Sequence, residues 1–156
     1  MNITVIALGK LKEKYLKDAI SEYAKRISAY GKLDIIELNP VRLSDNPSQT
    51  EIDNALSKEA EEIKKKIPNN SYVFSLCIEG KEKSSESFAK AINDAAINGK
   101  SNIVFIIGSS FGLSPEIKTL SDFKLSFSPM TFPHQLMRVM LLEQIYRAFT
   151  ISGGSK

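Results

Sequence analysis

Segments with the hydrophobic pattern of β-strands alternate along the chain with segments that have the hydrophobic pattern of α-helices. Short, mainly apolar runs typical of strands buried in a parallel sheet recur at 2–8, 33–38, 71–78, 102–108 and 123–128. Apolar residues at helical spacing follow at about 13–30, from 48, from 85, from 114 and from 134. The alternation predicts one α/β domain, residues 1–156, with a mostly parallel sheet and helices on both faces. The most apolar run, 102–108, is predicted to be the central strand.

Three local signals set helix boundaries. The S-Q-T-E stretch at 48–51 predicts a capping box, in which the first hydroxyl and the fourth carboxylate satisfy free backbone amides. Asn98 and Gly99 predict the end of a helix. Ser114-Pro115 predicts the start of a short helix, because proline at the first helical position loses no hydrogen bond.

The last helix is apolar on most of its sides, which predicts that it is buried on most of its sides. In a small α/β domain one side packs on the sheet, so the remainder is expected to meet a second copy in a homodimer. The apolar positions are Leu136, Met137, Val139, Met140, Leu141, Leu142, Ile145, Tyr146, Ala148 and Phe149.

Composition narrows the class of protein. The single cysteine, Cys77, gives no disulfide framework and suits a reducing cytoplasm; it is expected to be a core residue. One histidine and one cysteine make no zinc site, so no metal is predicted. The sequence has no apolar run long enough to span a membrane and no signal peptide, so we expect no membrane partner.

The net charge of +3 permits a nucleic-acid partner, although a dedicated DNA-binding domain is usually more basic, so DNA is not expected. The positive charge is clustered. The clusters are either solvated faces or contacts to an RNA backbone. They comprise Lys10, Lys12, Lys14 and Lys17 in one segment, and Lys64, Lys65 and Lys66 in another.

Two turns at strand ends carry the candidate site. The turn after the first strand, A-L-G-K-L-K-E-K-Y, lacks the glycines of a dinucleotide site, and no Walker lysine motif is present. Glu37, at the end of the second strand, is therefore expected to be a surface residue. Gly108 opens a small-residue turn at 106–116, and a turn rich in apolar and hydroxyl side chains occupies 126–134. Since ligands of open α/β sheets bind beyond the carboxyl strand ends, both turns are expected to line one pocket, although 106–116 alone could be an ordinary turn.

The same segments carry a resemblance to a known family. The block L-S-F-S-P-M-T-F-P-H-Q-L-M-R-V-M-L-L-E-Q-I-Y-R-A at 125–148, the turn F-I-I-G-S-S-F-G at 105–112 and the opening 3–27 resemble the ribosomal RNA large subunit methyltransferase H family. The resemblance implies a SPOUT fold with a C-terminal trefoil knot. It also implies a homodimer that uses S-adenosylmethionine to methylate N3 of a pseudouridine in 23S rRNA on the assembled ribosome.

The resemblance also implies which residues hold the cofactor. The implied contacts are Leu76, Gly108, Phe127, Ser128, Pro129, Met130, Thr131 and Phe132. Two departures accompany it. The family's second glycine after the fourth strand is Ser109 here, and the family's Tyr-His-Lys segment would follow Lys156.

Three cations are candidates for catalysis, because N3 of pseudouridine must lose a proton and a positive group near the uracil carbonyls would help it leave. His134 could alternatively pack or cap the last helix. Arg138 could form a dimer ion pair, for instance to Glu143 of the second copy. Arg147 could stabilise the helix end or pair across the dimer.

Two rival functions remain open from the sequence. One is a ribosome-binding protein of the same fold without catalysis. The other is a general α/β nucleotide-binding enzyme.

Overall fold

The computed structural model describes residues 1–153 and contains ten elements in strict alternation up to the last helix. In chain order they are β1 (Asn2–Leu8), α1 (Lys14–Ile27), β2 (Lys32–Leu38), α2 (Gln49–Lys66), β3 (Ser71–Glu82), α3 (Ser85–Ile97), β4 (Asn102–Ile107), α4 (Pro115–Leu120), β5 (Phe123–Ser126) and α5 (His134–Ser152).

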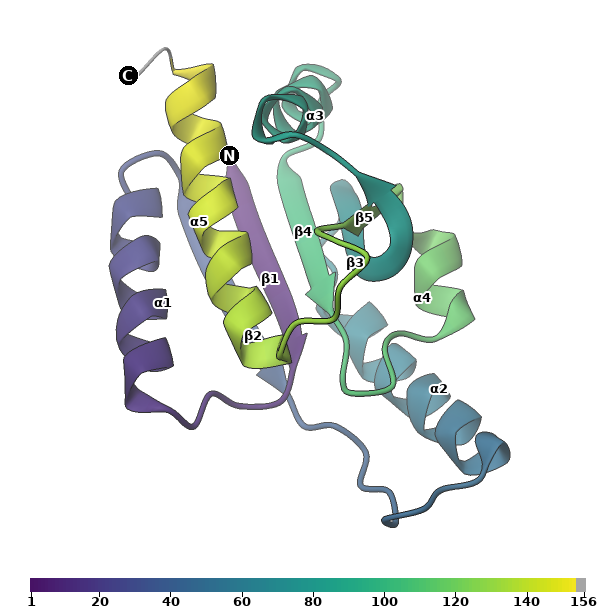
Figure 1. The fold of residues 1–156 in the computed structure, drawn as a ribbon. Coiled ribbons are helices and arrows are strands. Elements are labelled where there is room, and N and C mark those ends of the chain that lie inside the picture. The colour runs from purple at the N-terminus through teal and green to yellow at the C-terminus, as the bar shows by residue number, and fades with distance from the viewer. Residues whose placement is uncertain (154–156) are drawn as a thin grey trace.

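The strands form one five-stranded sheet in the order β2-β1-β4-β3-β5, and each neighbouring pair is parallel. The sheet is thus entirely parallel, where the sequence predicted mostly parallel, and β4 is central as predicted. Helices α1, α5 and α3 cover one face, while α2 and α4 cover the other (Figure 1). The carboxyl ends of all five strands therefore point to one edge.

The core is two apolar layers separated by the sheet. On the α5 side, the ring of Phe74 stacks on Phe105 with centroids 4.9 Å apart and meets Phe88 edge-on at 5.8 Å. On the α2 side, Ile63 and Ile117 pack against the opposite face of β1 and β4. No helix in the described residues is long and apolar enough to cross a membrane.

The predicted helix boundaries are confirmed by their hydrogen bonds. The Ser48 hydroxyl accepts the Glu51 N–H at 3.1 Å, and the Ser48 N–H donates to the Glu51 carboxylate at 3.0 Å. The Ser114 hydroxyl accepts the Ile117 N–H at 3.2 Å at the start of α4. Gly99, just beyond α3, has a φ of 91°, the left-handed conformation that ends helices at glycine.

Two strand ends differ from the sequence prediction. β3 continues to Glu82 instead of ending at 78, and β5 ends at Ser126 instead of 128. The reason is that β3 pairs with β5 twice. It pairs first through Phe74–Leu76 and again through Lys81–Glu82, with Cys77–Gly80 bulging out between them. β3 therefore curves around the end of β5 before it reaches α3 (Figure 1).

The second pairing of β3 with β5 requires a glycine at position 80. A Cβ there would lie 2.5 Å from the Lys124 carbonyl oxygen and 2.7 Å from its carbon, closer than packed atoms approach. Backbone cannot yield as a flexible side chain does, so any side chain at position 80 would push β3 away from β5.

We predict that Gly80→Ala lowers the free energy of unfolding by about 1–3 kcal/mol, the usual cost of forcing an extra carbon into a packed site. Urea unfolding followed by circular dichroism measures the change. Gly153→Ala is the matched control, because its Cβ would lie 3.2 Å from the nearest atom, the Phe149 carbonyl oxygen. Equal stability of the two variants would contradict the tight β3–β5 return.

Candidate functional site

A cavity of about 370 Å³ lies at the carboxyl ends of β3, β4 and β5. This volume is in the range of small-molecule sites. The β3 bulge, the turn after β4, and the segment between β5 and α5 form its walls. Of the residues proposed to hold a cofactor, the cavity is lined by Leu76, Gly108, Phe127, Ser128, Met130, Thr131 and Phe132; Pro129 belongs to the same segment but does not line it.

Gly108 is needed for the shape of the turn after β4. A Cβ on Gly108 would collide with the carbonyl group of Gly112 and lie 3.0 Å from the Leu113 side chain. The chain folds back there because Gly112 has a φ of 83° and its N–H donates to the Ser109 carbonyl oxygen at 2.8 Å. Gly108 therefore permits the close approach of its own turn, and it also lines the cavity, where the sequence interpretation expects backbone to approach a ligand.

The segment after β5 is held by its serines. The Ser126 hydroxyl donates to the Ser128 carbonyl oxygen at 3.2 Å, and the Met130 N–H donates to the Ser128 hydroxyl at 3.0 Å. These short-range bonds shape the wall of the cavity while leaving the Met130 side chain 72% exposed.

Cys77 was expected to be a core residue, and this was wrong. It lies on the β3 bulge, is half-buried, and lines the 370 Å³ cavity. Burial, assisted by the nearby Glu79 carboxylate, raises the pKa of the Cys77 thiol, so the neutral form is favoured. Cys77 therefore contributes polarizable surface to the wall and is a poor nucleophile.

His134 begins α5 and is half-buried. Among the described residues its ring makes no hydrogen bond that caps the helix. It lines the 370 Å³ cavity and also a second cavity of about 710 Å³ on the other side. Burial lowers the pKa of His134 below its usual 6.5, so the ring is mainly neutral at pH 7.

Arg138 is buried one turn further along α5, with 2% of its surface exposed. Its guanidinium donates to the Glu37 carboxylate at 2.5 Å and to the Gly9 carbonyl oxygen at 3.1 Å. The same carboxylate accepts the Leu11 N–H at 3.1 Å. Glu37 is exposed, as predicted for a surface residue, and it also joins the ends of β1 and β2 to the start of α5.

Arg147 lies far along α5, is exposed, and lines neither of these two cavities. It donates to Glu143 of its own helix at 2.9 Å, an i,i+4 ion pair. The structure therefore brings His134 to the proposed cofactor residues, places Arg138 beside the second cavity, and leaves Arg147 apart.

The second cavity contains a buried carboxylate that the sequence analysis missed. Glu59, on α2, is 5% exposed. It accepts the Val41 N–H at 2.9 Å and the Ser109 hydroxyl at 3.2 Å. The sequence carried one signal for this buried carboxylate. Glu59 lies on the apolar face of α2, next to Ala55 and Ala60, where an acid must find hydrogen-bond partners inside the protein.

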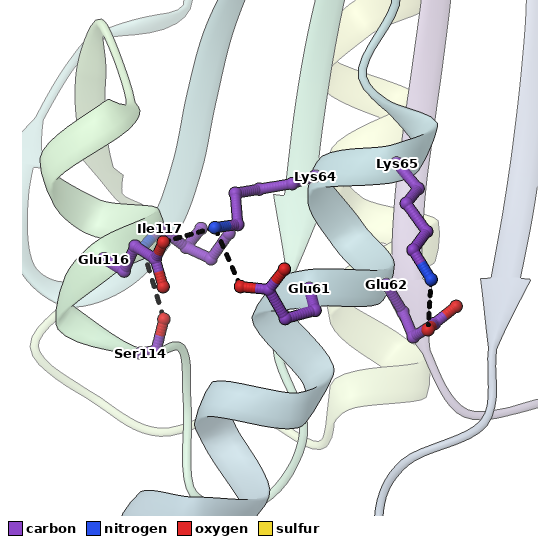
Figure 2. Close-up of polar contacts among 7 residues, drawn as sticks. All are labelled: Glu61, Glu62, Lys64, Lys65, Ser114, Glu116 and Ile117. Carbon is purple, nitrogen blue, oxygen red and sulfur yellow. Dashed lines mark hydrogen bonds and ion pairs between the residues drawn. The ribbon is translucent and has the colours of Figure 1, made fainter.

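The two lysine clusters differ in their surroundings. Figure 2 shows that Lys64 pairs with Glu61 at 2.9 Å and with Glu116, while Lys65 pairs with Glu62 at 3.0 Å. This cluster is largely neutralised and lies at the carboxyl end of α2, away from the site. Lys10, of the other cluster, lies on the β1–α1 loop and lines the 710 Å³ cavity. Within residues 1–153, no group of acidic, histidine and cysteine side chains could hold a metal ion.

Known proteins are similar to this protein along nearly its whole length. Residues 1–156 match a family model described as a predicted SPOUT methyltransferase. The putative ribosomal RNA large subunit methyltransferase H of Methanococcus maripaludis (strain C5) is 62% identical over 99% of this chain and 97% of that protein. The ribosomal RNA large subunit methyltransferase H of Clostridium kluyveri (strain ATCC 8527) is 54% identical with the same coverage.

A solved structure agrees at the level of the fold. A probable methylase family protein from Haemophilus influenzae Rd KW20 has a TM-score of 0.52 and 15% identity, with 98% of this chain and 67% of that chain covered. Fold and sequence together define a SPOUT methyltransferase. Within that class, the chain belongs to the ribosomal RNA large subunit methyltransferase H family, as its motifs predicted.

We predict that the His134 ring titrates below pH 6.5, because burial penalises its charged form. His134 is the only histidine in the chain, so its ring C–H proton gives one NMR titration curve that needs no assignment by mutation. Phe132→Ala should move the midpoint back toward 6.5 by admitting water to the 370 Å³ cavity, which Phe132 and His134 both line. A midpoint at or above 6.5 in the unmodified protein would contradict the structure.

Proposed function

We propose that this methyltransferase transfers a methyl group from S-adenosylmethionine to N3 of a pseudouridine in 23S ribosomal RNA on the assembled ribosome, as one domain spanning the chain. Family membership supports the reaction. One observation supports a location for the reaction in the molecule. The 370 Å³ cavity is lined by the segments on which the family resemblance falls.

The residues present fit S-adenosylmethionine. Apolar walls from Leu76, Ile107 and Leu125 suit a purine ring, while the hydroxyls of Ser128 and Thr131 offer hydrogen bonds to a ribose. We assign cofactor binding to Leu76, Gly108 and the Phe127–Phe132 segment. Bound there, the cofactor would supply an electrophilic methyl group on a positively charged sulfur.

The protein's own task is to position the acceptor and receive its proton. N3 would give up its proton to the protein and accept the methyl group that the bound cofactor would supply. His134, neutral and placed between the two cavities, is our candidate to accept the proton. We assign Arg138 a positioning role, because its guanidinium is already bound to Glu37 and Gly9.

The chain path supports a trefoil knot as the finer description of the fold. β3 pairs with β5 on both sides of its bulge, and the bulge lines the same cavity as the segment that leaves β5. That segment then continues to α5, which lies on the sheet between α1 and α3 (Figure 1). A C-terminal trefoil knot is what the family resemblance implies for this path of the chain.

The outer side of α5 supports a homodimer. Leu136 is 40% exposed and Ile151 is 36% exposed, and Met140 between them is half-buried. These residues recur on one side of the helix and form a stripe on the protein surface, which is apolar apart from the Glu143–Arg147 ion pair between Met140 and Ile151. We propose that this stripe meets its copy in a second subunit, and that the enzyme works on ribosomes in the cytoplasm.

The reaction is tested by transfer of labelled methyl from S-adenosylmethionine to ribosomes that lack the modification, including a preparation with the family's Tyr-His-Lys segment after Lys156. We predict that His134→Ala lowers kcat by roughly 100-fold or more, the usual contribution of a positioned base. His134→Gln is the matched control, because it keeps a polar side chain of similar volume at this position. Unchanged kcat in His134→Ala would remove the ring from the chemistry.

The two rival functions predict different experimental results. An inactive ribosome-binding protein would cosediment with ribosomes and transfer no methyl group. A general nucleotide-binding enzyme would be stabilised by a dinucleotide or ATP in a thermal-shift panel. S-adenosylmethionine at 100 times its dissociation constant should stabilise this chain by about 2.7 kcal/mol.

We predict that Met140→Glu converts the dimer to a monomer, because it adds a negative charge without a partner next to Glu143 in this stripe. Static light scattering at micromolar concentration measures the mass, against 17.3 kDa for one chain. Ile97→Glu is the control, since Ile97 is 73% exposed at the end of α3, on a different helix. A single-chain mass for the unmodified protein would contradict the dimer.

A further inference from the structure

The 710 Å³ cavity lies beside the proposed cofactor cavity, beyond the carboxyl ends of β1 and β2. Its walls come from the β1–α1 loop, the β2–α2 loop, α2 and the start of α5. The two cavities share the Ser109–Phe111 turn and His134. A molecule in either cavity would therefore contact these shared residues.

This cavity is built from buried charged groups, which distinguishes it from a surface hollow. Glu59 is 5% exposed and Arg138 is 2% exposed, and both line it. Their hydrogen bonds fix the surrounding loops: Glu59 holds Val41 of the β2–α2 loop, and Arg138 holds Gly9 of the β1–α1 loop. The walls are thus set before any ligand arrives.

The remaining lining combines apolar, aromatic and cationic groups. Leu8, Leu16 and Leu56 supply apolar surface within the cavity. Two aromatic rings stand at its edge, Phe111 at 47% and Tyr15 at 69% exposure. Unstacked RNA bases are held by stacking on such rings, and lysines beside them meet the phosphates, a position that Lys10 occupies here.

We propose that this cavity is the acceptor site, which receives the flipped pyrimidine nucleotide of the RNA while the cofactor occupies the neighbouring cavity. The proposal rests on the proposed function. It assigns Tyr15 and Phe111 to stacking, Lys10 to the phosphate, and Glu59 with Arg138 to holding the walls. We assign the transfer to the place where the two cavities meet, at the residues they share and next to His134.

The test fills the cavity from an exposed position. Ser44 lines it from the β2–α2 loop and is exposed, so Ser44→Trp should fold and occupy the space of the base. Ser57→Trp is the control, because Ser57 is exposed on α2 and does not line the cavity. Neither serine lines the cofactor cavity. The readouts are kcat/KM for ribosomes, ribosome affinity by cosedimentation, and S-adenosylmethionine affinity by calorimetry.

We expect Ser44→Trp to lower ribosome affinity and kcat/KM by roughly fivefold or more, the contribution of one stacked base, with cofactor affinity unchanged. Ser57→Trp should match the unmodified protein. Tyr15→Ala should lower kcat/KM through KM, and Tyr15→Phe should restore it, since stacking needs the ring and not the hydroxyl.

Two failures can be told apart. If the unmodified protein transfers no methyl group, the proposed function fails, and ribosome affinity alone still decides whether the cavity takes RNA. If Ser44→Trp binds and methylates ribosomes as Ser57→Trp does, the acceptor site is elsewhere and the inference is overturned. Loss of cofactor affinity in Ser44→Trp would likewise overturn it, because the two cavities would then be one site.

Discussion

The site depends on the double pairing of β3 with β5. A strand that pairs, bulges and pairs again places its bulge at a fixed height above the sheet edge, and here the bulge Cys77–Gly80 becomes one wall of the proposed cofactor cavity. The contact is possible only because Gly80 brings backbone against backbone at Lys124. The turn after β4 follows the same principle, since Gly108 lies against Gly112. Two close backbone contacts therefore set the positions of the loops, and the side chains on those loops line the cavity.

A second constraint fixes the start of α5. An arginine with 2% exposure would be costly without partners, and Glu37 and Gly9 supply them. Through Arg138 the ends of β1 and β2 are joined to the helix that presents His134. The ion pair is thus better understood as a device that sets the position of the histidine than as a source of stability, because the desolvation of the buried guanidinium offsets much of the attraction.

The sequence predicted the order of elements, the central strand and the two turns of the site, because hydrophobic period, caps and glycines are local signals. It could not predict the extension of β3 to Glu82, since E-G-K-E carries no apolar pattern and forms a strand only because β5 is beside it. The partners of Arg138 and Glu59 were equally hidden. Both are long-range contacts, 101 residues apart for Arg138 and Glu37 and 50 for Glu59 and Ser109. The family resemblance contributed the cofactor segment, which no periodicity reveals.

The departure at Ser109 gains a physical meaning from the structure. Where the family resemblance implies glycine, this chain has a hydroxyl that donates to the buried Glu59 carboxylate. The turn that separates the two cavities is thereby tied to α2, and through the Val41 N–H to the β2–α2 loop. A glycine at this position would leave one carboxylate oxygen without that partner and the turn freer to move. Through Glu59, the serine thus links the turn shared by both cavities to the β2–α2 loop, which lines the larger one.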